Sequence, residues 1–398
     1  MTLQDYLAAG ALAAGVLALP AAWAAWSSWR TTRQAGGKDR FLDHLRSLRD
    51  NQGTLTRRVL EASPERLRQP GLPLLTKPEW SLVVPFDLAD IKVEWLDGQL
   101  DDVTKLRRAS SKVLAKLRIA PITRYSTALV EIAGLTRLFD GVIYRLIEAE
   151  FTADVKRMVF CRATYFADLD TSEVLAFEAQ TSRRRPYRRR LQDPFDFRRR
   201  VAGLGIDTLT IRRDGERAGF FLHRRDPKNV VNNASMIGLI PAGEFTPSDV
   251  SSEAMSRDLD LWKNIMREYA EEMLGVPDAQ GQGGRWIDYA SESPFWELEM
   301  ARATGQLQVK VLGLGIDPLP WKTELLTVCV IDAEVFDRIF APVPVRNEEG
   351  IIIAGDRKNG LLFDATTVDR YCREPDVSPN TQACLRLAWR YRDQLGLS

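Results

Sequence analysis

Three glutamates near the middle of the chain have the type and spacing to bind a divalent cation. Glu268, Glu271 and Glu272 lie at i, i+3 and i+4, so a helix here brings their carboxylates to one face. A hard cation relieves their mutual repulsion, and Mg²⁺ keeps part of its water shell for a substrate phosphate. The spacing therefore predicts Mg²⁺ or Mn²⁺ ligands, with a solvated acidic face as the alternative. Leu261, Ile265, Tyr269 and Met273 give the opposite side an apolar stripe, which favours a helix over residues 258–274.

Two upstream segments could complete a phosphate site. Pro241-Ala242-Gly243-Glu244 follows an apolar run and indicates a tight turn that presents the carboxylate of Glu244. Arg224 and Arg225 follow a predicted strand, and guanidinium groups match phosphate oxygens in shape and charge. We expect Arg224, Arg225 and Glu244 to contact substrate. The general base stays open among Glu244, Glu292 and Glu297.

The string Arg267-Glu268-x-x-Glu271-Glu272, followed by a glycine, resembles the core of the Nudix box. The turn at 241–244 resembles the one that commonly opens this motif, and residues 204–340 have the length and order of the Nudix α/β/α sandwich. The family usually hydrolyses a nucleoside diphosphate linked to another group, using Mg²⁺ or Mn²⁺. The resemblance implies that Glu271 and Glu272 are metal ligands and that Glu268 is a ligand or orients water. It also implies that Arg267 braces these carboxylates.

Two departures from the motif keep a second function open. Met273 and Leu274 separate the glutamate pair from Gly275, where the family has one residue, and the connection at 245–260 is longer than usual. The primary expectation is Mg²⁺-dependent hydrolysis of a pyrophosphate bond in a nucleoside diphosphate derivative. The alternative is a non-catalytic nucleotide sensor coupled to a membrane anchor. Membrane-tethered Nudix-like domains are suspected nucleotide sensors in bacterial defence systems, an analogy that favours the alternative.

A basic run follows the predicted helical region. Nine arginines lie between Arg183 and Arg200. Such a run repels itself unless anions or water surround it. Three interpretations stay open, namely contact with anionic lipid, contact with nucleic acid or nucleotide phosphate, and a solvated loop.

The spacing of apolar residues predicts the helices and strands that must position these side chains. Helical spacing favours helices at 39–62, 101–118, 122–148, 258–274 and 382–395. Apolar runs between turn signals favour strands at 158–166, 208–212, 219–223, 236–240, 307–313 and 325–331. The expected fold class is α/β, a Nudix-type α/β/α sandwich with a mixed sheet, preceded by a helical region and one N-terminal transmembrane helix.

The N-terminal segment predicts that the protein is anchored in a membrane. Residues 6–26 are uncharged and long enough to cross a bilayer, and basic residues follow them. The positive-inside rule then puts the body of a single-pass protein in the cytoplasm. A cleaved signal peptide and a soluble helix are the alternatives. The expected parts are an anchor at 1–30, a helical region at 31–150 that could also form a homodimer, a Nudix-like domain at 151–345 and a C-terminal extension at 346–398.

Composition excludes several classes of function. The 398 residues hold 55 basic and 54 acidic side chains, so no global charge marks a nucleic-acid binder. Four scattered cysteines exclude a disulfide scaffold, and two histidines argue against a His-rich zinc site. The sequence also lacks a P-loop and a GxSxG elbow.

Overall fold

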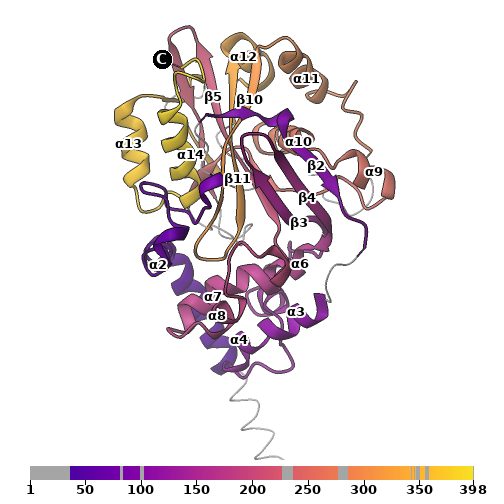
Figure 1. The fold of residues 1–398 in the computed structure, drawn as a ribbon, viewed down its shortest axis with the longest axis vertical. Coiled ribbons are helices and arrows are strands. Elements are labelled where there is room, and N and C mark those ends of the chain that lie inside the picture. The colour runs from indigo at the N-terminus through magenta and orange to yellow at the C-terminus, as the bar shows by residue number, and fades with distance from the viewer. Residues whose placement is uncertain are drawn as a thin grey trace, which may run out of the picture.

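A mixed sheet forms the centre of the molecule (Figure 1). The structure is a computed structural model, and it describes residues 36–80, 84–98, 103–225, 236–276, 286–341, 343–344, 346, 350–354 and 358–397. In this part of the chain the sheet has the strand order β1-β10-β11-β5-β6-β13, with β9 also paired to β5. Strands β5 and β11 are parallel, and β10 is antiparallel to β11. The bounds are β1 Phe86–Asp87, β5 Leu204–Asp214, β6 Arg217–Phe220, β9 Ala242–Glu244, β10 Leu307–Ile316, β11 Thr323–Asp332 and β13 Leu361–Leu362.

Two smaller sheets accompany it within the described ranges. In the first, β4 (Lys156–Thr164) is parallel to β2 (Lys92–Trp95) and antiparallel to β3 (Val142–Phe151). The second has the order β12-β7-β8, with bounds Gly350–Ile353, Leu222–Arg225 and Ile237–Leu239. The amide of Tyr144 on β3 donates to the carbonyl of Phe245 at 3.0 Å, which ties the first small sheet to the chain after β9.

Helices surround these sheets, beginning with one that covers residues 36–50. The others are α2 Gln52–Glu61, α3 Val103–Ser110, α4 Lys112–Ala115, α5 Tyr125–Glu131, α6 Tyr165–Asp168, α7 Val174–Thr181, α8 Pro186–Leu191, α9 Ser252–Arg257, α10 Leu261–Leu274, α11 Phe295–Ala303, α12 Ala333–Phe340, α13 Ala365–Arg373 and α14 Pro379–Arg390. A π-helical turn at Leu169–Glu173 joins α6 to α7, and short 3-10 turns lie at Glu65–Leu67, Pro78–Trp80, Leu88–Asp90 and Phe197–Arg199.

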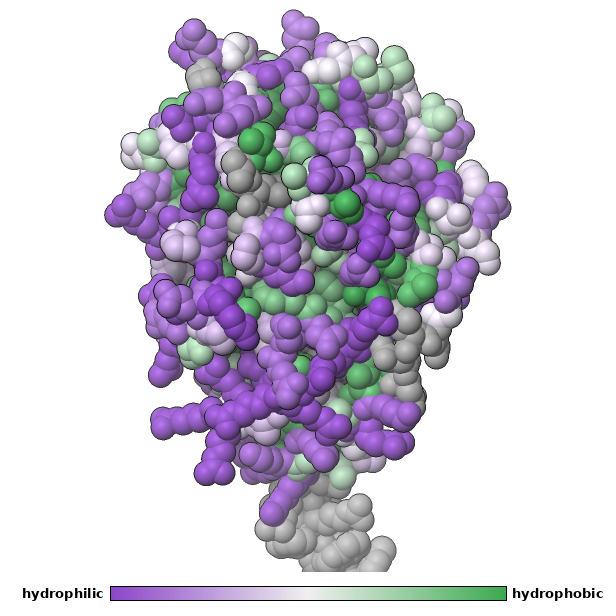
Figure 2. Space-filling view, viewed as in Figure 1, coloured by the Kyte–Doolittle hydropathy of each residue, from purple (hydrophilic) through white to green (hydrophobic). Residues whose placement is uncertain are grey.

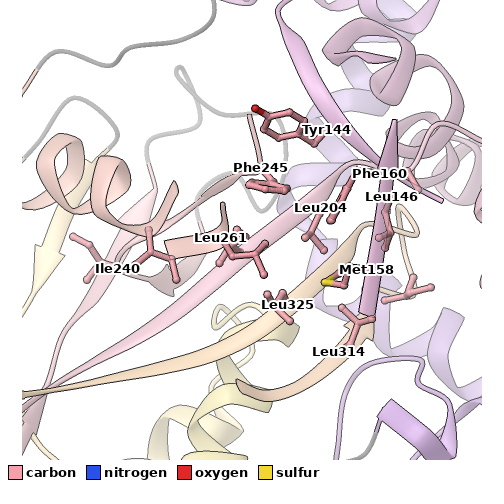
Figure 3. Close-up of a cluster of buried hydrophobic side chains, with 14 of the residues drawn as sticks. Tyr144, Leu146, Met158, Phe160, Leu204, Ile240, Phe245, Leu261, Leu314 and Leu325 are labelled. Carbon is pink, nitrogen blue, oxygen red and sulfur yellow. The ribbon is translucent and has the colours of Figure 1, made fainter. Parts of the chain in front are cut away.

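Side-chain alternation along β5 separates two cores. Leu204 and Ile206 belong to one apolar cluster, which also contains the buried side of α10 and much of β3 and β4. Figure 3 shows Leu204, Leu325 and Leu261 among its members. Leu209 and Ile211 point to the other face, where α14 packs. Because successive strand residues face opposite sides, Gly203, Gly205 and Asp207 lie on the α14 face.

The expected fold class is wrong in two respects. Within the ranges that the structure describes, no helix is long and apolar enough to cross a membrane, and the segment at 6–26 lies outside those ranges. The described chain is a mixed α/β structure with three sheets, not one sandwich behind a helical region.

The helix expected at 122–148 is also wrong in its second half. Helix α5 ends at Glu131, and Gly134 adopts a left-handed backbone (φ 71°) soon after it. The chain then forms β3, whose residues from Val142 to Leu146 are all buried. A strand buried on both faces does not alternate apolar with polar residues, so its pattern is easily taken for part of an apolar helix face.

Candidate functional site

Helix α10 forms where the apolar stripe predicts it. The side chain of Asp260 caps its first turn by accepting from the amides of Trp262 at 2.9 Å and Lys263 at 3.2 Å. Gly275 ends it with a left-handed backbone (φ 69°). Ile265, Tyr269 and the rest of the stripe are buried, so the helix is fixed on the sheet side by packing.

The helix places two of its three glutamates against β9. The carboxyl group of Glu268 fills the space beside Gly243, since a Cβ built on Gly243 would lie 2.0 Å from the carboxyl carbon. The carboxylate of Glu272 is buried and accepts from the amide of Ala242 at 3.3 Å. Glu271 is partly exposed. The turn at 241–244 and the glutamates of α10, separated by a long connection, therefore lie together.

Arg267 contacts the connection after β9 and a neighbouring side chain of α10. Its guanidinium is buried and donates to the hydroxyl of Tyr289 and to the side-chain oxygen of Asn264, both at 2.8 Å. It also lies 3.7 Å from Asp258, within the long connection after β9. Asn264 in turn donates to Glu268 at 3.4 Å. Arg267 thus holds the connection against α10 and reaches Glu268 through Asn264.

The two arginines of β7 have different positions. Arg225 donates to the carbonyl oxygen of Ala242 at 2.8 Å, so its guanidinium reaches the turn that Glu268 and Glu272 contact. Arg224 pairs with Asp376 at 2.8 Å, and both side chains are exposed. The structure therefore places Arg225 at the turn beside α10, whereas Arg224 forms an exposed ion pair with Asp376.

Glu244 lies on the opposite side of β9 from Glu268. It pairs in register with Gly205, and its carboxylate forms an ion pair with Lys322. Burial raises the pKa of Glu244 to about 7, although Lys322 opposes the shift. The other two candidates for the general base lie near the start of α11, where Glu292 accepts from the amide of Asp288 and Glu297 accepts from the hydroxyl of Ser293.

A buried acidic cluster surrounds Lys322, and no motif in the sequence predicted it. Its members are Asp168, Glu173, Asp207, Glu244, Asp317 and Glu324. Burial alone would lower the pKa of Lys322, but Glu244 and Asp168 outweigh it and raise that pKa well above its usual value. Burial raises the pKa of Asp207 and of Glu324. The carboxyl groups of Asp207 and Glu324 are therefore held neutral at pH values where exposed ones are ionised.

Two glycines make room for this acidic cluster. A Cβ on Gly203 would lie 2.0 Å from Oε1 of Glu244, and a Cβ on Gly205 would lie 1.9 Å from Oε2 of Glu324. Both glycines belong to the first of two GLGID pentapeptides, and the aspartates that end the two copies, Asp207 and Asp317, are buried. Residues 204–207 lie in β5 and residues 313–316 end β10, so most of each pentapeptide is strand sequence.

Glu173 should make stability depend on pH. Burial, followed by repulsion from Asp168, raises its pKa from 4.5 to about 8. Between these values the unfolded chain loses the proton and the folded chain keeps it, so stability falls as pH rises. Glu173→Gln should reduce the stability lost between about pH 5.5 and pH 8.5 by about 2 kcal/mol or more. Urea unfolding at both pH values measures this loss. Equal losses in the variant and in wild type would contradict the prediction, and the exposed Glu131→Gln is the control.

Part of the basic run is structural. Arg188 donates to the carbonyl of Pro318 at 2.7 Å and lies over the ring of Trp321. Arg200 is buried and donates to Ser172 at 3.2 Å. Arg183, Arg189 and Arg198 are among the exposed members of the run, so the interpretations involving an anionic partner apply to that exposed part alone.

The glutamates of α10 offer the kind of ligand atom that Mg²⁺ prefers. Their donors are all oxygens, and the carboxyl group of Glu268 occupies the space that the missing Cβ of Gly243 leaves beside the turn. Among the described residues, no three His, Cys, Asp or Glu side chains are grouped as metal ligands. Mg²⁺ is usually held by one or two carboxylates together with water and substrate phosphate, so the residues present fit this ion.

Comparison with known proteins assigns this chain to no family. No protein-family model matches this chain, and no curated protein does.

Proposed function

We propose that this chain hydrolyses a pyrophosphate bond in a nucleoside diphosphate derivative, in the manner of the Nudix motif that its sequence resembles. One observation carries the proposal. Two glutamates of α10 contact the turn at 241–244, because Glu268 lies against Gly243 and Glu272 accepts from the amide of Ala242. A helix face rich in carboxylates and a tight turn beside it offer a place for a diphosphate with its cation.

The residues have separable roles in this proposal. When bound, Mg²⁺ would neutralise phosphate charge and lower the pKa of a coordinated water. Glu271 and Glu272 would hold the ion, with Glu268 as a further ligand or as the residue that orients water. Glu272 would also keep the turn in place through Ala242. Arg225 sets a positive charge at the same turn, where phosphate oxygens would gather.

A second candidate function is a nucleotide sensor without turnover. The bond between Glu272 and Ala242 favours it, because a carboxylate committed to a backbone amide is less available to a metal ion. The long connection after β9 favours it too, since Asp258 and Arg267 fix that segment in a buried network.

Turnover of a substrate panel distinguishes the two functions. The full chain is incubated with ADP-ribose, a dinucleotide and a sugar nucleotide, with Mg²⁺ or with EDTA, and products are separated by chromatography. A hydrolase releases nucleoside monophosphate only with Mg²⁺. A sensor leaves every compound intact, but one of them raises the melting temperature. If the folded protein neither releases product nor gains in melting temperature with any compound, both proposed functions are refuted.

A further inference from the structure

Several helices line a cavity of about 430 Å³. Among them, α4, α7 and α8 lie at the end of the molecule away from α10 (Figure 1). The helix at 36–50 supplies Arg40 and His44 to its lining, and the residues from α4 to the following turn supply Lys112 and Lys116. Glu178 of α7 and Arg190 of α8 complete its charged lining. Figure 2 shows hydrophilic side chains gathered over this end of the molecule.

Packing fixes the walls of this cavity. Phe41 is fully buried and contacts the rings of Tyr125 and Phe177, which holds the helix at 36–50 against α5 and α7. The ring of His44 lies edge-on to Phe177 at 6.1 Å. Arg40 donates to the carbonyl oxygen of Leu117 at 3.1 Å, so its side chain spans from one wall to the other. The cavity is therefore preformed.

Positive charge predominates in this lining. Glu178 is buried, and its two oxygens accept from the amides of Tyr187 at 2.7 Å and Arg188 at 3.0 Å. Its negative charge thus caps the start of α8. In the part of the chain that the structure describes, none of the four arginine and lysine side chains of the lining forms an ion pair with a carboxylate. Four cationic groups therefore converge on a cavity with one carboxylate, whose oxygens two backbone amides already bind. This excess of positive charge favours an anionic ligand.

We propose that this cavity binds a phosphorylated small molecule. Its volume is in the range of sites for ligands of drug or nucleotide size. Lys112, Lys116 and Arg190 offer charged donors to phosphate oxygens. Val113, Leu117 and Pro186 line the remainder and suit an organic portion. This site is separate from the turn beside α10 and needs no metal ion.

Calorimetric titration of the full chain with ADP and with inorganic pyrophosphate, in EDTA, tests the proposal. EDTA removes the metal ion on which the proposed hydrolysis at α10 depends. Binding measured in EDTA therefore tests the cavity alone, and its result does not depend on whether the hydrolysis proposal is correct. Binding should weaken at least about tenfold in the double variant Lys112→Ala, Lys116→Ala, because two charged donors are lost. Both lysines are exposed, which keeps the fold intact. Arg108→Ala, an exposed change on α3 outside the cavity, is the control and should bind like wild type.

Three results would overturn the proposal. The first is that wild type binds neither ADP nor pyrophosphate. The second is equal binding by the lysine double variant and wild type. The third is that phosphatidylcholine vesicles containing phosphatidylglycerol bind with the same dependence on Lys112 and Lys116 while ADP does not. That result would assign the cavity to a lipid headgroup.

Discussion

Lys322→Met should destabilise the protein by about 3–5 kcal/mol, the usual cost of removing one partner from a buried ion pair. Lys322 is buried, pairs with Glu244 and lies 3.7 Å from Asp168. Methionine fills a similar volume without charge, so the carboxylates lose their cation while the packing changes little. Urea unfolding near neutral pH measures the loss. We expect a smaller loss under mildly acidic conditions, because Glu244 and its neighbours then take up protons.

Lys310→Met is the matched control. Lys310 pairs with Asp87 at 3.3 Å, and both side chains are partly exposed. An ion pair in contact with water contributes about 0–1 kcal/mol, so this variant should lose no more than that. Similar losses in the two lysine variants would contradict the account of the acidic cluster.

The double variant Glu271→Gln, Glu272→Gln should lose hydrolysis by at least about 100-fold, because charge stabilisation by a bound cation is a large part of catalysis. Glutamine at 272 can still accept from the amide of Ala242, so the melting temperature should change little. Initial rates with the best substrate of the panel measure the effect. Glu253→Gln, an exposed change on α9, is the control. If the double variant is as active as wild type, Glu271 and Glu272 take no part in hydrolysis.

Local signals in the sequence predicted much of the fold around α10. The helix itself, β4, β10 and β11 lie close to their expected positions because an apolar stripe or an apolar run between turns marks each of them. The contact between Glu268 and Gly243 joins two segments that the motif resemblance already paired.

What the sequence could not predict depends on contacts between distant segments. Asp168, Asp207 and Glu324 come from a helix and two strands, and no spacing relates them. The GLGID glycines were the one local signal, because glycine at alternate positions of a strand leaves one face open to other side chains. The structural roles of Arg188 and Arg200 likewise depend on distant partners, so the sequence does not separate these two arginines from their exposed neighbours.

Binding of Mn²⁺ tests most directly whether the glutamates of α10 form a cation site. Electron paramagnetic resonance distinguishes free Mn²⁺ from bound Mn²⁺ in a titration of the full chain. The account predicts that wild type and Glu253→Gln bind Mn²⁺ alike in the presence of ADP, and that Glu271→Gln, Glu272→Gln binds it at least about tenfold more weakly. Equal binding by the double variant and wild type, or no binding by wild type, would contradict it.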